Sequence, residues 1–113
     1  MDVLCEVRQG VAVIVLRTEY LDASSVEEFK GSVASILESN KNVVLDLSGL
    51  QFVDSAGLGA LLSCLRKTAA AGGDLKVSGL TKPVRSVFEI SRLHRVFDIY
   101  QKQADAVLAF TSA

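Results

Sequence analysis

The chain has 113 residues, a length that fits one domain with an ordinary hydrophobic core. Half of the residues are hydrophobic, 22% are charged and one is proline, which excludes a disordered or fibrous protein. The net charge of −1 and the scattered basic residues argue against nucleic acid as a partner, because a phosphate backbone is bound by clustered positive charge. We expect a single domain over residues 1–113.

The first ten residues, MDVLCEVRQG, carry charges where a signal peptide needs an apolar core. No later segment approaches the ~18 consecutive apolar residues of a membrane span. The sequence therefore predicts a cytoplasmic protein with no membrane partner. Cys5 and Cys64 lie far apart and outside any Cys/His cluster, so we interpret both as partly buried, reduced thiols with no metal or redox role.

Strands are predicted from short apolar runs. Residues 3–8 and 11–16 flank a Gln9-Gly10 turn and indicate a hairpin, whose second arm is apolar on both faces and so belongs inside a sheet. The runs NVVLDL, DLKVSGL and VFDIY predict three further strands, starting near residues 42, 74 and 96.

Helices are predicted between these strands. The first follows Ser24 and Ser25, either of which could form a capping box with a glutamate three residues later, Glu27 or Glu28. The second runs from Ser55 to Ala71 and ends at Gly72-Gly73. Its expected inner face consists of the apolar residues at helical spacing: Leu58, Leu61, Leu62, Leu65 and Ala69.

A third helix over residues 81–93 has Pro83 in its first turn and Val84, Val87 and Phe88 facing inward, and a fourth covers residues 104–110. Strands that alternate with helices after an initial hairpin indicate an α/β fold. We expect a mixed central sheet of four to five strands, in which parallel strands follow the hairpin, with about four helices.

Ser55 is the candidate functional residue, in VVLDLSGLQFVDSAGLGALLSCLRK at residues 43–67. A nucleophilic serine needs a base, normally a histidine held by a carboxylate, but the only histidine is His94, near the end of the third helix, and the GxSxG elbow is absent. A dinucleotide loop would need a third glycine at Leu62, and the sequence lacks the Gly-Lys-Ser/Thr end of a P-loop.

Two other interpretations remain open at this point. Asp46, at a strand end, could be the phosphorylated aspartate of a receiver domain, although no adjacent acidic pair follows the first strands to hold magnesium. Ser55 could also be a simple helix N-cap. A capping role for Ser55 leaves Gly57 and Gly59 unexplained, because two glycines weaken the first turn of a helix. A surface without side chains, against which a partner packs, would explain both glycines.

Taken together, LDLSGLQFVDSAGLGALLSCLRK, the preceding YLDASSVEEF and the following GGDLKVSGLTKPVRSVFEISRLHRVFDIY closely resemble the STAS domains of bacterial anti-sigma factor antagonists. The resemblance implies a protein without catalytic residues, cofactor or metal that binds an anti-sigma factor and so frees a sigma factor. The anti-sigma factor would also be a serine kinase that phosphorylates Ser55 and thereby releases the antagonist, and a PP2C-type phosphatase would reverse the modification.

The partner-binding residues implied by the resemblance surround Ser55: Asp22, Asp54, Ala56, Gly57, Leu58 and Gly59. Asp22 could equally be a helix-capping aspartate. Ala56 stands where many relatives have a second serine, which leaves Ser55 as the only hydroxyl of the motif. Two alternatives to a phosphorylation switch remain: a STAS scaffold or assembly subunit in a signalling or transport complex, and a small nucleotide-binding protein.

Overall fold

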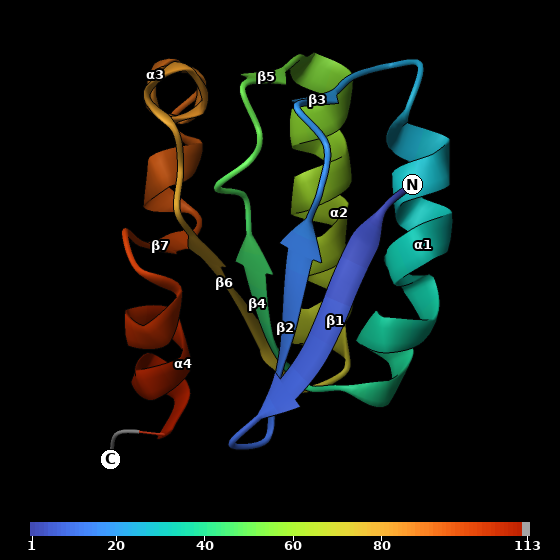
Figure 1. Cartoon of the computed structure of the whole chain (residues 1–113), viewed down its shortest axis with the longest axis vertical. Coiled ribbons are helices and arrows are strands. Elements are labelled where there is room, and N and C mark those ends of the chain that lie inside the picture. Colours follow the sequence, from blue (N-terminus) through green and yellow to red (C-terminus); the bar gives the residue numbers. More distant parts are fainter. Residues whose placement is uncertain (112–113) are drawn as a thin grey trace.

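The computed structural model describes residues 1–111 and contains a five-stranded sheet covered by helices (Figure 1). The strands follow the order β1-β2-β4-β6-β7, with β1 and β2 antiparallel and all other neighbours parallel. Their bounds are β1 Val3–Arg8, β2 Val11–Leu16, β4 Asn42–Asp46, β6 Asp74–Ser78 and β7 Asp98–Tyr100. The predicted mixed sheet and its N-terminal hairpin are confirmed.

Within residues 1–111, four α-helices and one short 3₁₀ helix accompany these strands, and α4 follows the last strand. Their bounds are α1 Val26–Ser39, α2 Ser55–Ala70, α3 Lys82–Ile90, η1 Leu93–Arg95 and α4 Gln103–Thr111. The third predicted helix is shorter than expected, because Arg92 adopts a left-handed conformation (φ 63°) after α3 and separates it from η1. None of the helices within residues 1–111 combines the length and the apolar character that crossing a membrane requires.

The alternation of side chains along β2 separates two cores. Ala12, Ile14 and Leu16 face α1, α2 and α3, whereas Val11 and Val13 face α4 on the opposite side of the sheet. The larger core contains Phe29, Leu45, Leu61, Leu75 and Phe88, all fully buried. The valine-rich β2 is therefore buried on both faces, as predicted.

The inner face of α2 differs from the prediction. Its buried residues are mostly small: Gly57, Ala60, Leu61, Cys64 and Thr68. Leu58, Leu62 and Leu65 are only half-buried and Ala69 is exposed. Small residues face the core because α2 packs closely against its neighbours, and the leucines fill the space on either side.

Two further expectations were wrong. No capping box forms at α1: Ser25 is the N-cap residue, but its side chain makes no cap hydrogen bond. Cys5 is exposed on β1, although Cys64 is buried as expected.

The sequence prediction also missed a second, two-stranded sheet. Strands β3 (Tyr20–Leu21) and β5 (Phe52–Val53) run parallel and lie at one end of the molecule, beside the start of α2 (Figure 1). Each follows a strand of the main sheet, β2 or β4. Because the carboxyl ends of parallel strands lie at the same edge, this small sheet brings two distant segments together beside Ser55.

Candidate functional site

Ser55 is the first residue of α2 and its side chain is exposed. Asp54, not Ser55, is the N-cap: its backbone is extended (φ −98°, ψ −174°), and its Oδ1 accepts a hydrogen bond from the Gly57 amide at 2.8 Å. A serine hydroxyl at the first helical position is not required for capping. The interpretation of Ser55 as the cap is therefore wrong, and its hydroxyl is available to a partner.

Asp54 also connects α2 to the segment before α1. Its second oxygen, Oδ2, accepts a hydrogen bond from the Ala23 amide at 3.0 Å, and its own amide donates to the Leu21 carbonyl at 3.3 Å. One carboxylate thus caps α2 and fixes the neighbouring loop. The rigid surroundings of Ser55 depend on this residue.

Asp22 lies in that neighbouring loop, one residue beyond β3. Its Oδ1 accepts hydrogen bonds from the Ser24 hydroxyl at 2.6 Å and the Ser24 amide at 3.0 Å. The bond from the Ser24 hydroxyl is the main reason that the pKa of Asp22 lies below its ordinary value. Asp22 therefore carries a negative charge close to the start of α2 and also orders the turn into α1.

The two glycines of the motif occupy different environments. Gly57 is buried, and a Cβ atom placed on it would lie 2.4 Å from the Leu21 carbonyl oxygen and 2.6 Å from Cγ2 of Val53. Gly59 is exposed, with nothing within 4 Å of such an atom. The fold itself therefore excludes a side chain at Gly57, whereas Gly59 leaves open space, and a partner contact at Gly57 stays a prediction.

The candidate surface therefore consists of Asp22, Asp54, Ser55, Ala56 and Gly59, with the half-buried Leu58 beside them. In the part of the chain that the structure describes, no hydrogen bond joins the Ser55 side chain to a histidine or a carboxylate. The exposed His94 instead places Nδ1 3.3 Å from the Phe88 carbonyl oxygen. Asp46 is buried and bonded to Gln103 Nε2 at 2.6 Å and to the Ser48 amide at 2.9 Å.

Two exposed aromatic side chains adjoin this surface. Tyr20 and Phe52 are neighbours across the β3–β5 ladder, and each is more than half exposed. The sequence contains a repeated pattern from which these two residues could have been identified: Tyr20-Leu21-Asp22 and Phe52-Val53-Asp54. In each triplet the aromatic residue points outward, the aliphatic residue points into the core and the aspartate follows the strand.

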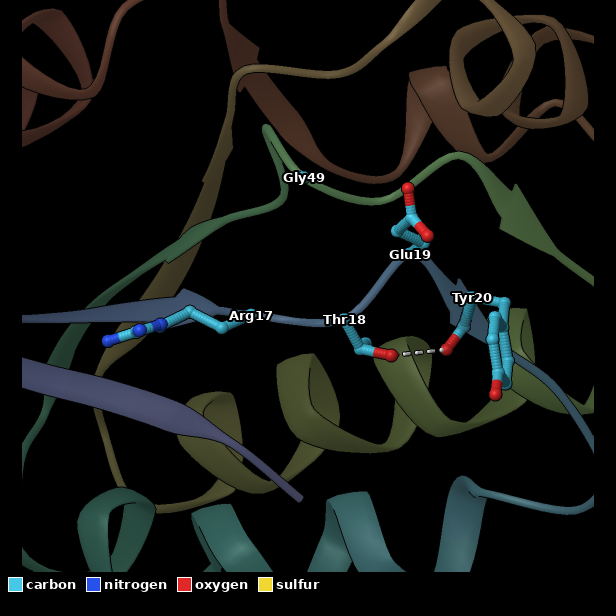
Figure 2. A pocket seen from close by; sticks show the side chains of 5 residues that line it. All are labelled: Arg17, Thr18, Glu19, Tyr20 and Gly49. Carbon is cyan, nitrogen blue, oxygen red and sulfur yellow. Dashed lines mark hydrogen bonds between the residues drawn. The ribbon is translucent and has the colours of Figure 1, made fainter.

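On the side of Tyr20 nearer the main sheet lies an open hollow of about 410 Å³ (Figure 2). It is lined by Arg17, Thr18, Glu19, Tyr20 and Gly49. The Thr18 hydroxyl donates to the Tyr20 carbonyl at 3.2 Å and fixes this loop. Among residues 1–111 no three His, Cys, Asp or Glu side chains form a metal-binding group.

The model of the STAS domain family matches residues 2–106. The chain belongs to the STAS domain family. One relative is the putative anti-sigma factor antagonist BtrV of Bordetella bronchiseptica, which is 30% identical over 94 residues, 82% of this chain and 81% of BtrV. Another is the anti-sigma F factor antagonist of Paenibacillus polymyxa, 28% identical over 104 residues, 90% of this chain and 88% of the relative.

Solved STAS structures show the same fold. An anti-sigma factor antagonist domain protein from Planctomyces limnophilus has a TM-score of 0.90 at 19% identity, covering 99% of this chain and all of the other. The phosphorylated form of the Bacillus cell fate determinant SpoIIAA has a TM-score of 0.71 at 22% identity, covering 96% of this chain and 99% of SpoIIAA. At these identities the likeness establishes the fold alone.

Proposed function

We propose that the protein is an anti-sigma factor antagonist that is switched off by phosphorylation of Ser55. The unphosphorylated protein binds an anti-sigma factor that is also a serine kinase, and a sigma factor is thereby released in the cytoplasm. The kinase then phosphorylates Ser55 with ATP, and a PP2C-type phosphatase removes the phosphate. The protein acts through binding and carries out no catalysis itself.

The observation that carries this proposal is the position of Ser55 as an exposed first residue of α2, beside a cap supplied by another residue. A phosphate there would lie at a helix N-terminus, where the dipole and the free amides favour an anion. A kinase can reach the hydroxyl, and the helix tolerates the product. SpoIIAA, which shares the fold, has itself been solved in a phosphorylated form.

The same phosphate would oppose binding. A phosphoserine carries about −1.5 to −2 charges at pH 7. In an interface it would lie near the carboxylates of Asp54 and Asp22, which already accept hydrogen bonds from their own loop. A buried charge without a partner costs roughly 3 to 5 kcal/mol, and about 1.4 kcal/mol is a factor of ten in affinity. Phosphorylation should therefore weaken binding at least ~100-fold.

Tyr20 and Phe52 are proposed to supply the apolar part of the interface. Aromatic side chains are enriched among the residues that dominate binding energy, and these two form a pair beside the switch residue. Changing Phe52 to serine should therefore weaken binding while Ser55 remains intact.

The proposal is tested with the anti-sigma factor captured from the native host on immobilised Ser55→Ala protein. The wild type should gain one phosphate by intact mass when mixed with that partner and ATP, and Ser55→Ala should gain none. In calorimetry Ser55→Asp should bind at least ~100-fold more weakly than the wild type, whereas Ser35→Asp, at an exposed serine in the middle of α1, should bind normally.

Phosphate on Ser55→Ala would disprove the assignment of the switch residue. Equal binding of Ser55→Asp and wild type would instead favour a STAS scaffold that is not switched.

A further inference from the structure

Strand β1 forms a free edge of the main sheet. Within residues 1–111 it pairs with β2 alone, and at six residues it is twice as long as β7 at the opposite edge. Its apolar side chains Leu4 and Val7 are 49% and 62% exposed. A long edge strand with exposed apolar side chains offers unpaired backbone groups to another strand. We propose that β1 pairs antiparallel with β1 of a second copy of this chain, giving a two-fold symmetric dimer.

The hydrogen-bonding phase of β1 determines which residues can pair. The Arg17 amide donates to the Asp2 carbonyl at 3.0 Å, and Arg17 and Asp2 continue the β1–β2 register. Because hydrogen-bonded and non-hydrogen-bonded pairs alternate in an antiparallel ladder, the even-numbered residues of β1 bond to β2. The amides and carbonyls of Val3, Cys5 and Val7 therefore point outward.

One register uses all three outward residues. It places Cys5 opposite Cys5 of the second copy and Val3 opposite Val7, as three hydrogen-bonded pairs. On the other face it places Asp2 opposite Arg8 of the second copy, so that each copy contributes one acid and one base. Between these charged pairs, Leu4 lies opposite Glu6 of the second copy. This charge complementarity identifies the occupant of the edge as a second copy.

The neighbouring registers that keep the same phase are disfavoured. A shift in one direction places Glu6 opposite Glu6 of the second copy, and a shift in the other places Asp2 opposite Glu6. Like charges directly opposite each other destabilise a strand pair. Each shift also reduces the number of outward residues that find a partner.

The dimer leaves both Ser55 surfaces free. Strands β2, β4 and β6 all end at the edge that carries β3, β5 and the start of α2, and β1 runs in the opposite direction (Figure 1). Antiparallel pairing of β1 therefore sends the two Ser55 surfaces to opposite ends of the dimer. One strand on each side forms a small interface, so the association should be weak and depend on concentration.

Sedimentation equilibrium tests the association. The mass of purified wild-type protein should rise from the 12.1 kDa of the monomer towards twice that value as the concentration is raised to about 1 mM. Val7→Lys removes both apolar Val3–Val7 pairs and adds a positive charge to the edge of each copy, so it should weaken association at least ~10-fold. The matched control is Ile90→Lys at the end of α3, an element that is not part of the β1 edge and where the side chain is 84% exposed. This variant should associate like the wild type.

Cross-linking tests the register without a destabilising substitution. A short bis-maleimide should join two wild-type copies through Cys5, because opposite residues in a hydrogen-bonded pair have Cα atoms about 5.5 Å apart. Cys64 is buried and does not compete. In a Cys5→Ser background, Val7→Cys should cross-link much more slowly, since Val7 faces Val3 in this register.

The proposal is overturned by a constant mass of 12.1 kDa up to about 1 mM, by equal weakening in Ile90→Lys, or by equal cross-linking through position 7.

Discussion

Gly57 and Gly59 lie two residues apart in the first turn of α2 and face opposite environments. Gly57→Ala would force a Cβ atom to within 2.4 Å of the Leu21 carbonyl oxygen, so we expect a loss of roughly 1 to 3 kcal/mol in the free energy of unfolding. Gly59→Ala is the matched control: its Cβ meets nothing, and the better helix propensity should stabilise the protein by ~0.5 to 1 kcal/mol. Urea unfolding measures both, and equal effects would contradict the assignment of Gly57 to the core.

The thiol of Cys64 should make stability fall at high pH. Burial raises the pKa of Cys64 from its ordinary value of 9.0 to about 11, against smaller lowering effects of Lys67 and Lys30. Below pH 9 the thiol is protonated whether the chain is folded or not, so its contribution is fully present. Between about pH 9 and 11 only the unfolded chain releases the proton, which costs about 2 kcal/mol of stability.

The comparison with Cys64→Ala isolates this effect from other groups that titrate at high pH. The difference in unfolding free energy between wild type and variant should narrow as the pH rises from about 9 to 11. A difference that stays constant across this range would show that ionisation of the Cys64 thiol does not cause the loss of stability at high pH.

The residue-level chemistry around Ser55 was only partly predictable from the sequence. Ser55 could be identified as a candidate for modification from the sequence. The missing base argued against a nucleophile, and the missing glycine and lysine argued against a nucleotide-binding loop. Capping could not be assigned, since both Asp54 and Ser55 are good N-caps and the choice depends on backbone angles. The role of Gly57 depends on the Leu21 carbonyl, 36 positions earlier in the chain, and no local pattern reveals that contact.

At the scale of elements, α4 is held to the sheet by a few polar contacts as well as by Ala106 and Val107. Gln103, the first residue of α4, donates through Nε2 to Asp46 at the end of β4 and accepts a hydrogen bond from Arg8. Gln103→Ala should remove roughly 1 to 2 kcal/mol of stability, because the buried Asp46 carboxylate loses one donor. Hydrogen exchange should quicken in α4 before it does in β4. The exposed neighbour Gln101 is the control, and Gln101→Ala should change neither quantity.

Elements with a strong hydrophobic period were predicted well, and short ones were not. Five main strands and four helices follow from runs of alternating or helical apolar residues. β3 and β5 have two residues each, too few to show a period, and they exist because the ends of β2 and β4 bring them together. The predicted inner face of α2 was right for Leu61 and only partly right for the other leucines, which pack at the border of the core. The pattern of leucines does not show how closely the helix packs, and the small residues Gly57, Ala60 and Cys64 permit that close packing.

At the scale of the whole molecule, the Ser55 surface is a rigid corner of the fold. The β3–β5 ladder, the bonds of Asp54 and the contact of Gly57 with Leu21 fix the relative positions of α2 and the loop before α1. A charge added at Ser55 projects from this corner into solvent. We therefore expect the partner to respond to the phosphate by direct contact, without a conformational change in the main sheet.

Ser55→Glu tests this expectation on the isolated protein. A negative charge at the first position of α2 should raise the free energy of unfolding by ~0.3 to 1 kcal/mol, since it complements the helix dipole. Ala70→Glu, an exposed position at the other end of the same helix, should lower it by a similar amount. In ¹⁵N-resolved NMR spectra, the shifts caused by Ser55→Glu should stay within residues 20–25 and 52–60. Shifts that reach β1, β7 or α4 would instead show that charge at Ser55 acts by reshaping the molecule, and the phosphate would then switch binding through conformation.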